Sequence, residues 1–181
     1  MKTLITSLVL TALLCSSAAA ATVGGITLPK KQGDLELSGA GLLRKGFIFK
    51  IYVGALYVAE PEHTRNILSN VPKRIDIHYF HHTPKKHMLR VADETLQNNL
   101  TDEQYTALLP KIGKLHDVFR DGKKGSCASI LHEPGKGLTY TFDDQPVITI
   151  PGDDFANAYF SIWLGKQPSS RSMKEAMLNQ G

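Results

Sequence analysis

The chain has 181 residues, of which 42% are hydrophobic and 21% are charged, with 15 glycines, 9 prolines and 2 cysteines. This composition excludes disordered, collagen-like and disulfide-dense classes and is typical of one globular domain. The formal net charge of +4 is mild and no long basic run occurs, so the sequence does not predict a nucleic-acid-binding protein.

The N-terminal segment has the layout of a secretory signal peptide. A basic start at Lys2 precedes an apolar run at Leu4–Leu14 and a small-residue stretch at Ser16–Ala21, which predicts cleavage after Ala20 or Ala21. The apolar run is shorter than the ~20 residues needed to cross a bilayer, and no later segment comes close. We therefore expect residues 1–21 to direct export, to the periplasm in a double-membrane bacterium, and residues 22–181 to form a single domain.

The two cysteines do not predict a disulfide in the exported domain. A lipid anchor on Cys15 is the alternative to cleavage at the alanines, but Leu14 stands where lipoprotein signals carry a small residue. After cleavage Cys127 is the sole cysteine. We interpret it as a small residue on a strand rather than a nucleophile.

The first half of the predicted domain is rich in strand signals. Short alternating segments at Thr22–Leu28 and Asp34–Leu37 predict strands, and Gly39–Gly41 predicts a flexible corner after them. The strongest signal is Phe47–Val58, which is rich in aromatic and β-branched residues and apolar at nearly every position. Such a run is typical of a strand that is covered on both faces.

Alternation along this strand assigns its side chains to two faces. Period-two counting places Lys50 and Tyr52 on the same face. That face also carries Ile48, Gly54, Leu56 and Val58. We therefore expect a lysine and a phenol side by side on a mainly apolar surface.

The middle of the chain predicts helices beside one more strand. Thr101 and Gln104 form a capping box for a helix that runs to about Phe119, and Pro110 is expected to kink or break it. The other elements expected here are a short helix at Pro61–Asn70, a strand at Lys73–His82, and a helix at Pro84–Leu100 with Met88, Val91, Thr95 and Leu96 on one stripe.

A hairpin and two helices are predicted toward the C-terminus. Strands at Ser126–His132 and Leu138–Phe142 flank a Pro-Gly turn, and a third strand follows at Val147–Ile150.

The first of the two helices is predicted at Phe155–Leu164 and is capped by Asp153 and Asp154. The second is capped by Ser169 or Ser170. Because strands and helices segregate along the chain, the predicted fold class is α+β with a largely antiparallel sheet.

A cluster of histidines raises the alternative of a metal binder. On one strand, His81 and His82 would point to opposite faces, while His78 and His82 would lie about 13 Å apart at ~3.3 Å per residue. Ligand nitrogens must lie about 2 Å from one metal, so neither pair closes a site. We expect the cluster, which also includes His87, to be solvated, and we expect no bound metal.

Other catalytic signatures are absent from the sequence. It has no phosphate loop, dinucleotide fingerprint, nucleophile elbow or cysteine pair with zinc spacing. The paired carboxylates Asp143–Asp144 and Asp153–Asp154 occur where a turn or a helix cap needs them. Nothing therefore singles out general acid–base chemistry, and no cofactor is predicted.

A different set, Arg44, Lys50 and Tyr52, suits an anionic head group. Arginine offers a bidentate fork to a carboxylate, and a tyrosine adds one more donor. The alternative, which the pattern alone favours, is that Arg44 is solvated and Tyr52 packs against a helix.

Two blocks of sequence resemble chalcone isomerase-like domains. The first runs through Ser38–Lys45 into Phe49–Tyr57, and the second comprises Ile150–Ala156, Phe160–Gly165 and Pro168. The blocks lie in the expected order and the resemblance spans nearly the whole predicted domain, in the form of the exported bacterial branch. It implies an open-faced β-sandwich, in which helices cover one face of a large antiparallel sheet and a ligand cleft lies between them.

The resemblance implies two kinds of function. Plant isomerases of this family close a chalcone to a flavanone, whereas plastid relatives bind fatty acids with an Arg and a Tyr near the carboxylate. The isomerase arginine matches Arg44, although the Gly-Ala-Gly corner lies one residue further away here. The threonine that polarises the ketone falls on Tyr52, and a second hydroxyl residue of the pocket falls on Ile162. The helical Tyr and Asn of the isomerases have no clear match in residues 84–100.

Compared with the isomerases, this chain thus retains the arginine, at Arg44, but lacks most of the hydroxyl groups of their active site. Stabilising an oxyanion needs several positioned donors, so we expect a non-catalytic binder of a small amphipathic anion such as a fatty acid. Its ligand-binding residues would be Arg44, Lys50, Tyr52 and Ile162, and its apolar cleft would lie over Ile48, Leu56, Ile162 and Met88. The alternatives are an isomerase or intramolecular lyase on another substrate, and a structural protein whose cleft is filled by its own side chains.

Overall fold

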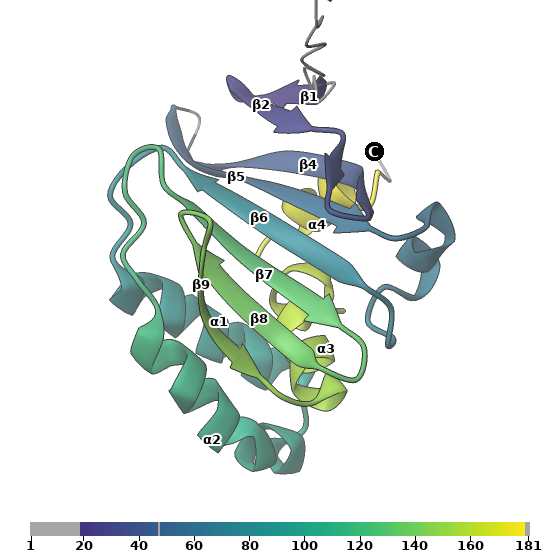
Figure 1. The fold of residues 1–181 in the computed structure, drawn as a ribbon. Coiled ribbons are helices and arrows are strands. Elements are labelled where there is room, and N and C mark those ends of the chain that lie inside the picture. Colours follow the sequence, from purple (N-terminus) through teal and green to yellow (C-terminus); the bar gives the residue numbers. More distant parts are fainter. Residues whose placement is uncertain (1–18, 47, 180–181) are drawn as a thin grey trace, which may run out of the picture.

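The computed structural model describes residues 19–46 and 48–179. Its central feature is a curled antiparallel sheet of seven strands in the order β3-β4-β5-β6-β7-β8-β9, with the helices on one face (Figure 1). The predicted α+β sheet covered by helices is confirmed. The strands are β1 (Ala19–Val23), β2 (Ile26–Pro29), β3 (Lys31–Gln32), β4 (Leu35–Lys45), β5 (Phe49–Val58), β6 (Lys73–Tyr79), β7 (Cys127–Glu133), β8 (Gly137–Phe142) and β9 (Gln145–Ile150).

Two long helices connect β6 to β7, and two further helices end the described chain. Among the described residues, no helix has the length and apolar composition to cross a bilayer. The helices are the 3₁₀ helix η1 (Pro61–Asn66), α1 (Lys85–Asn99), α2 (Asp102–Val118), α3 (Asp153–Leu164) and α4 (Arg171–Met177).

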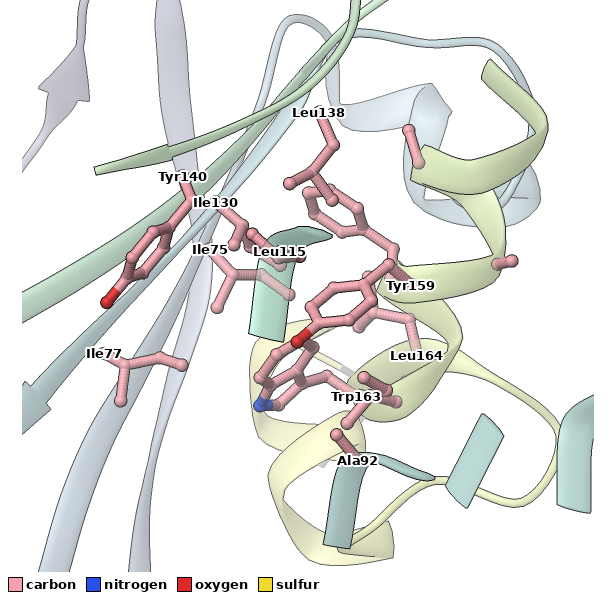
Figure 2. Packing of buried hydrophobic residues seen from close by; sticks show 14 of the residues in the cluster. Ile75, Ile77, Ala92, Leu115, Ile130, Leu138, Tyr140, Tyr159, Trp163 and Leu164 are labelled. Atoms are coloured by element: carbon pink, nitrogen blue, oxygen red, sulfur yellow. The ribbon is translucent and has the colours of Figure 1, made fainter. Parts of the chain in front are cut away.

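Two apolar clusters lie on opposite faces of the sheet. The larger one packs the sheet against the helices; Figure 2 shows Tyr159 and Trp163 projecting from α3 toward Ile75 and Ile77 of β6. The smaller one lies beneath the β1–β2 hairpin, where Tyr57 of β5 donates a hydrogen bond to the Pro29 carbonyl at 3.3 Å. Residues Val53–Val58 are accordingly buried on both faces, which confirms that part of the strand prediction.

The N-terminal part differs from the prediction in one element. The segment predicted as a single strand at Thr22–Leu28 is a hairpin that turns at Gly24 and Gly25, both of which have positive φ. Glycine adopts this backbone conformation without steric cost. The predicted signal peptide, residues 1–21, lies outside the described residues except for Ala19–Ala21 in β1.

The predicted corner at Gly39–Gly41 is wrong, because β4 continues through it, with only a shift of register to β5 between Leu37 and Gly39. A Cβ at Gly39 would collide with the carbonyl oxygen of Ala176 in α4, and one at Gly41 would lie 2.9 Å from the Sδ of Met173. Glycine within a strand often marks the close approach of another backbone. These glycines therefore let α4 lie against the sheet.

The second long helix begins and ends as predicted. Thr101 Oγ1 accepts from the Gln104 amide at 3.2 Å, and the Gln104 side chain accepts from the Thr101 amide at 3.0 Å. The helix continues through Pro110, so the predicted break is absent. Pro110 and Thr106 are both exposed, so water can satisfy the carbonyl that the proline leaves without a partner.

The caps of the last two helices follow the prediction only in part. Ser170 caps α4 and accepts from the Met173 amide at 3.2 Å. Helix α3 instead begins at Asp153 and has Gly152 as its N-cap, without a capping side chain. Asp153 and Asp154 therefore lie in the first helical turn, where carboxylates favour the positive end of the helix dipole.

Candidate functional site

Strand β5 contains a bulge at the end that faces α1. Leu43 of β4 pairs with Tyr52, and the next residue, Arg44, pairs with Lys50. Ile51 therefore has no partner on β4, and two residues of β5 oppose one of its neighbour. Such an extra residue reverses the alternation of side chains on either side of it.

The bulge separates Lys50 from Tyr52. Lys50 Nζ donates to the carbonyl of Gly24 in the β1–β2 turn at 2.7 Å and lies 5.4 Å from the centre of the Phe80 ring. Tyr52 packs against the cluster on the helical face. The prediction that these two side chains share a face is wrong, because period-two counting does not detect a bulge.

Arg44 lies at the same end of the sheet. Its neighbour Leu43 contacts the helical cluster and Leu42 the opposite one, so alternation places Arg44 on the face away from the helices. The side chain is exposed and stands opposite Lys50 in the register. Of the predicted ligand-binding residues, Arg44 and Lys50 are thus neighbours on one face, and Tyr52 and Ile162 lie on the other.

Between the sheet and the helices lies an apolar cavity of about 240 Å³. Tyr52 and Ile162 line it, as does Met88, whereas Leu56 is packed in the core and Ile48 lies outside the cavity. The cavity is lined by Leu43, Ile51, Tyr52, Ile77, Tyr79, Thr83, His87, Met88, Leu89, Val91, Ala92, Phe119, Tyr159, Ile162, Trp163 and Ser169.

Three tyrosines contribute hydroxyl groups to the cavity wall. The rings of Tyr52 and Tyr79 meet edge to face with centres 6.3 Å apart, and the Tyr79 hydroxyl donates to the sulfur of Met88 at 3.0 Å. The Tyr159 oxygen lies 3.4 Å from Nε2 of His116. Each phenol therefore has a protein partner, since the Trp163 indole is the partner of Tyr52.

Burial keeps these phenols neutral. It raises the pKa of Tyr52 to about 12, against a weaker opposing effect of the hydrogen bond with Trp163. Burial also raises the pKa of Tyr79 and of Tyr159. A neutral phenol can donate to an anion but is a poor nucleophile or base near neutral pH.

Sequence reasoning missed several of the cavity residues. Tyr159 and Trp163 are four residues apart on α3, one helical turn, and with Ile162 they could have been recognised as an inward stripe. Tyr79 was inside a predicted strand, but nothing in the sequence indicates that its end adjoins Met88. Phe119 directly follows α2 and stacks on Tyr140 with ring centres 4.5 Å apart.

An open groove of about 840 Å³ adjoins the cavity. Ile51, Thr83 and His87 line both, so the groove and the cavity lie side by side, and we interpret the groove as the mouth of the cavity toward solvent. Among the described residues, the groove is lined by Lys45, Gly46, Ile48, Phe49, Lys50, Ile51, His81, His82, Thr83, Pro84 and His87. None of these residues is acidic.

The histidines that raised the metal alternative are divided between two places. His81, His82 and His87 line the groove, beyond the end of β6 at Tyr79, so the strand predicted to reach His82 is shorter. His78 instead lies 3.9 Å from the sulfur of Cys127. Among the described residues, no three His, Cys, Asp or Glu side chains come close enough to hold a metal ion.

The environment of the Cys127 thiol disfavours nucleophilic reactivity. Burial raises its pKa to about 12, and the nearby carboxylate of Asp76 acts in the same direction. The reactive form of cysteine is the thiolate, so the thiol stays protonated near neutral pH. This is consistent with the interpretation of Cys127 as a strand residue.

A buried polar cluster at the other end of β6 has the composition of a catalytic site. Lys73 Nζ contacts the Ser69 carbonyl and Asn157 Oδ1 at 2.8 Å each, and Nδ1 of His132 at 2.9 Å. Nε2 of His132 lies 3.0 Å from Asp153. Lys73 and His132 are fully buried and neither lines a cavity among those described above, so we interpret the cluster as structural.

Comparison with known proteins identifies the family. A search of curated protein sequences found no match. Among solved structures, the fold is similar to the crystal structure of a fatty-acid binding protein of Arabidopsis thaliana, with a TM-score of 0.70 and 12% sequence identity over 86% of this chain and 93% of that one. The sequence model of the chalcone isomerase-like family matches residues 20–179. The resemblance seen in the two sequence blocks is thereby confirmed, and the chain belongs to the chalcone isomerase-like family.

Proposed function

We propose that this protein is an exported, non-catalytic binder of a small amphipathic anion, with a fatty acid as the favoured ligand. The observation that carries the proposal is the apolar cavity between sheet and helices, with neutral phenols on its wall and a groove beside it whose described lining residues include no carboxylate. Ligand sites are typically apolar clefts with a few placed polar groups. The similar plant structure is that of a fatty-acid binding protein, which supports the choice of ligand.

The size of the cavity sets the length of chain that it accepts. Its 240 Å³ is smaller than the ~300–1,000 Å³ of typical ligand pockets, yet larger than the ~150 Å³ of an apolar cavity that takes benzene. A short acyl chain fits inside, and a longer one would extend into the groove. We expect affinity to rise from hexanoate to dodecanoate and then to level off.

The carboxylate is proposed to lie at the mouth. Lys45 and Lys50 line the groove there, and Arg44 stands opposite Lys50 on the adjacent strand. Tyr52 supplies a neutral donor further in. In this arrangement the cations attract the anion from the rim, while the wall around Ile162 contacts its apolar body.

Replacing the arginine tests the anchor. A hydrogen bond to a charged group contributes about 1.5–3 kcal/mol, so Arg44→Ala should weaken dodecanoate binding roughly tenfold or more if the guanidinium contacts the carboxylate. Lys45→Ala tests the groove in the same titration, and Arg65→Ala, an exposed arginine on η1, is the matched control. If wild type and Arg44→Ala bind dodecanoate with equal affinity, Arg44 does not bind the carboxylate. The groove lysines would then be the remaining candidates for that role.

The alternative of an isomerase has one supporting observation, the hydroxyls of Tyr52, Tyr79 and Tyr159 on the cavity wall. Tyr79 and Tyr159 contact separate protein partners, Met88 and His116, rather than converging on one point as an oxyanion site requires. Conversion of an enone phenol by the purified protein, followed by absorbance, would favour the isomerase over the binder.

Export is tested on the protein from its native host. Cleavage after Ala20 or Ala21 would give a mature N-terminus at Ala21 or Thr22, which intact mass spectrometry of a periplasmic fraction resolves. Retention of Met1 in the cytoplasm would contradict this part of the proposal.

A further inference from the structure

The hairpin that joins β4 to β5 carries two apolar side chains in solvent. Ile48 is 79% exposed and Phe49 is 65% exposed, the largest values among the large hydrophobic residues described. Exposed apolar groups of this kind often mark a docking site. We define the β4–β5 tip as Arg44, Lys45, Ile48, Phe49 and Lys50.

The β4–β5 tip is also basic. Three of its five residues are cations, and residues 37–59 contain no Asp or Glu. The neighbouring segment, residues 80–90, adds Lys85, Lys86 and Arg90, although Arg90 pairs with Glu94 at 2.7 Å and Asp121 accepts from the Lys85 amide at 2.7 Å. The tip and the start of α1 thus present apolar and positively charged groups together, with more cations than carboxylates.

We propose that the β4–β5 tip docks on an anionic lipid surface. Ile48 and Phe49 enter the boundary between headgroups and acyl chains, and the surrounding lysines and arginines contact the lipid phosphates. Apolar side chains combined with cations bind membranes through both buried area and attraction to anionic lipid. The charge of the tip is complementary to such a surface over its whole extent.

Other partners fit the tip less well. A stable protein interface, including one with a second copy of this chain, buries about 800 Å² on each partner, which two side chains cannot supply. Single-stranded nucleic acid is held by cations and stacked aromatic rings, and an exposed isoleucine contributes to neither. A bilayer needs only a small apolar wedge with cations around it.

Docking would place the mouth of the cavity at the bilayer. Ile48, Phe49 and Lys50 of the tip line the groove, and the groove shares Ile51, Thr83 and His87 with the cavity. A ligand could then pass between bilayer and cavity without crossing bulk water. This consequence rests on the proposed function, whereas the docking itself does not.

Vesicle sedimentation of the mature chain tests the proposal. We expect partitioning onto vesicles that contain phosphatidylglycerol in phosphatidylcholine, weaker partitioning at high salt, and little on phosphatidylcholine alone. The double variant Ile48→Ser/Phe49→Ser should bind at least tenfold more weakly. Leu109→Ser, which removes an apolar side chain that is 45% exposed on α2, should bind like wild type. Because all three residues are exposed, thermal melting should show that each variant is folded.

Three results would overturn the proposal: no binding to either vesicle, equal binding by the double variant, or a concentration-dependent dimer that the double variant lacks. Titration with octanoate in the absence of vesicles separates the two proposals. If the double variant no longer binds vesicles but still binds octanoate, the result supports docking by the tip. A wild type that binds vesicles but no fatty acid of any length leaves the docking in place and contradicts the proposed function.

Discussion

The two ends of strand β6 show two ways of placing polar groups between the sheet and the helices. At one end, Lys73 contacts Ser69, His132 and Asn157, and no space remains around it. At the other end, about 20 Å away at ~3.3 Å per residue, Tyr79 lies at the wall of a cavity. The end with the buried charged cluster is therefore closed, and the candidate binding site lies at the end where an apolar cavity remains.

The comparison also separates stability from binding. A buried polar group must be paired to be tolerated, so the Lys73 cluster is expected to hold β6, β7 and α3 together. A cavity lacks packing contacts on its inner side, so the Tyr79 end is expected to contribute less to stability and to gain from a ligand. Variants at the two ends should therefore have opposite consequences.

The largest effect is expected at the closed end. Lys73→Met would leave the fully buried His132 Nδ1 and the half-buried Asn157 Oδ1 without their donor, and a buried unpaired acceptor costs about 1–3 kcal/mol. We expect a loss of about 3 kcal/mol in the free energy of unfolding, measured by urea denaturation, with ligand affinity of the folded fraction unchanged. Lys136→Met, at an exposed ion pair with Glu133, is the control and should change stability little. A large loss of ligand affinity in Lys73→Met would mean that the two ends are coupled.

A smaller effect on stability but a large one on binding is expected at the open end. Val91→Phe adds volume to the α1 wall of the cavity and should weaken binding of dodecanoate at least tenfold, or about 1.4 kcal/mol. Isothermal titration measures the affinity, and Leu109→Phe on the exposed side of α2 is the matched control. If Val91→Phe binds as well as wild type, the ligand lies outside the cavity.

Acid should destabilise the protein through buried histidines at both ends of β6. Burial lowers the pKa of His132, despite the opposing effect of its hydrogen bond with Asp153, so the folded state resists protonation there. As the pH falls below about 6.5, the usual value for histidine, the unfolded state takes up the proton first and stability is lost. Burial lowers the pKa of His116 and of His78 in the same way.

This pH dependence is measured by thermal melting between neutral pH and about pH 5. We expect His132→Gln to reduce the slope, with the remainder due to His116 and His78. An unchanged slope in His132→Gln would mean that the Lys73 cluster does not resist protonation in the folded state.

Much of the fold could be predicted from local sequence. The capping box at Thr101, the hairpin after Ser126 and the cap at Ser170 depend on neighbouring residues, and the structure has each of them. Gly39 and Gly41 were misinterpreted because their role depends on α4, which is more than 130 residues away in the chain. Glycine is suited both to a corner and to a close contact, and only the tertiary structure distinguishes the two.

The candidate site was predicted less completely, for the same reason. Tyr52 and Ile162 line the cavity, but the bulge at Ile51 directs Lys50 toward Gly24 instead. A bulge depends on the register with the adjacent strand, which a single strand's alternation does not contain. The cluster of Lys73, His132 and Asp153 was missed because its members come from three separate elements.

Trp163 allows a direct test of whether the proposed ligand binds in the cavity between sheet and helices. It is the single tryptophan of the chain and lines the cavity, so its fluorescence reports on that site alone. Titration of the purified protein with dodecanoate should give a saturable change in emission that Val91→Phe abolishes and Leu109→Phe preserves. Unchanged emission while native mass spectrometry detects a bound fatty acid, or no binding by either method, would contradict binding in the cavity.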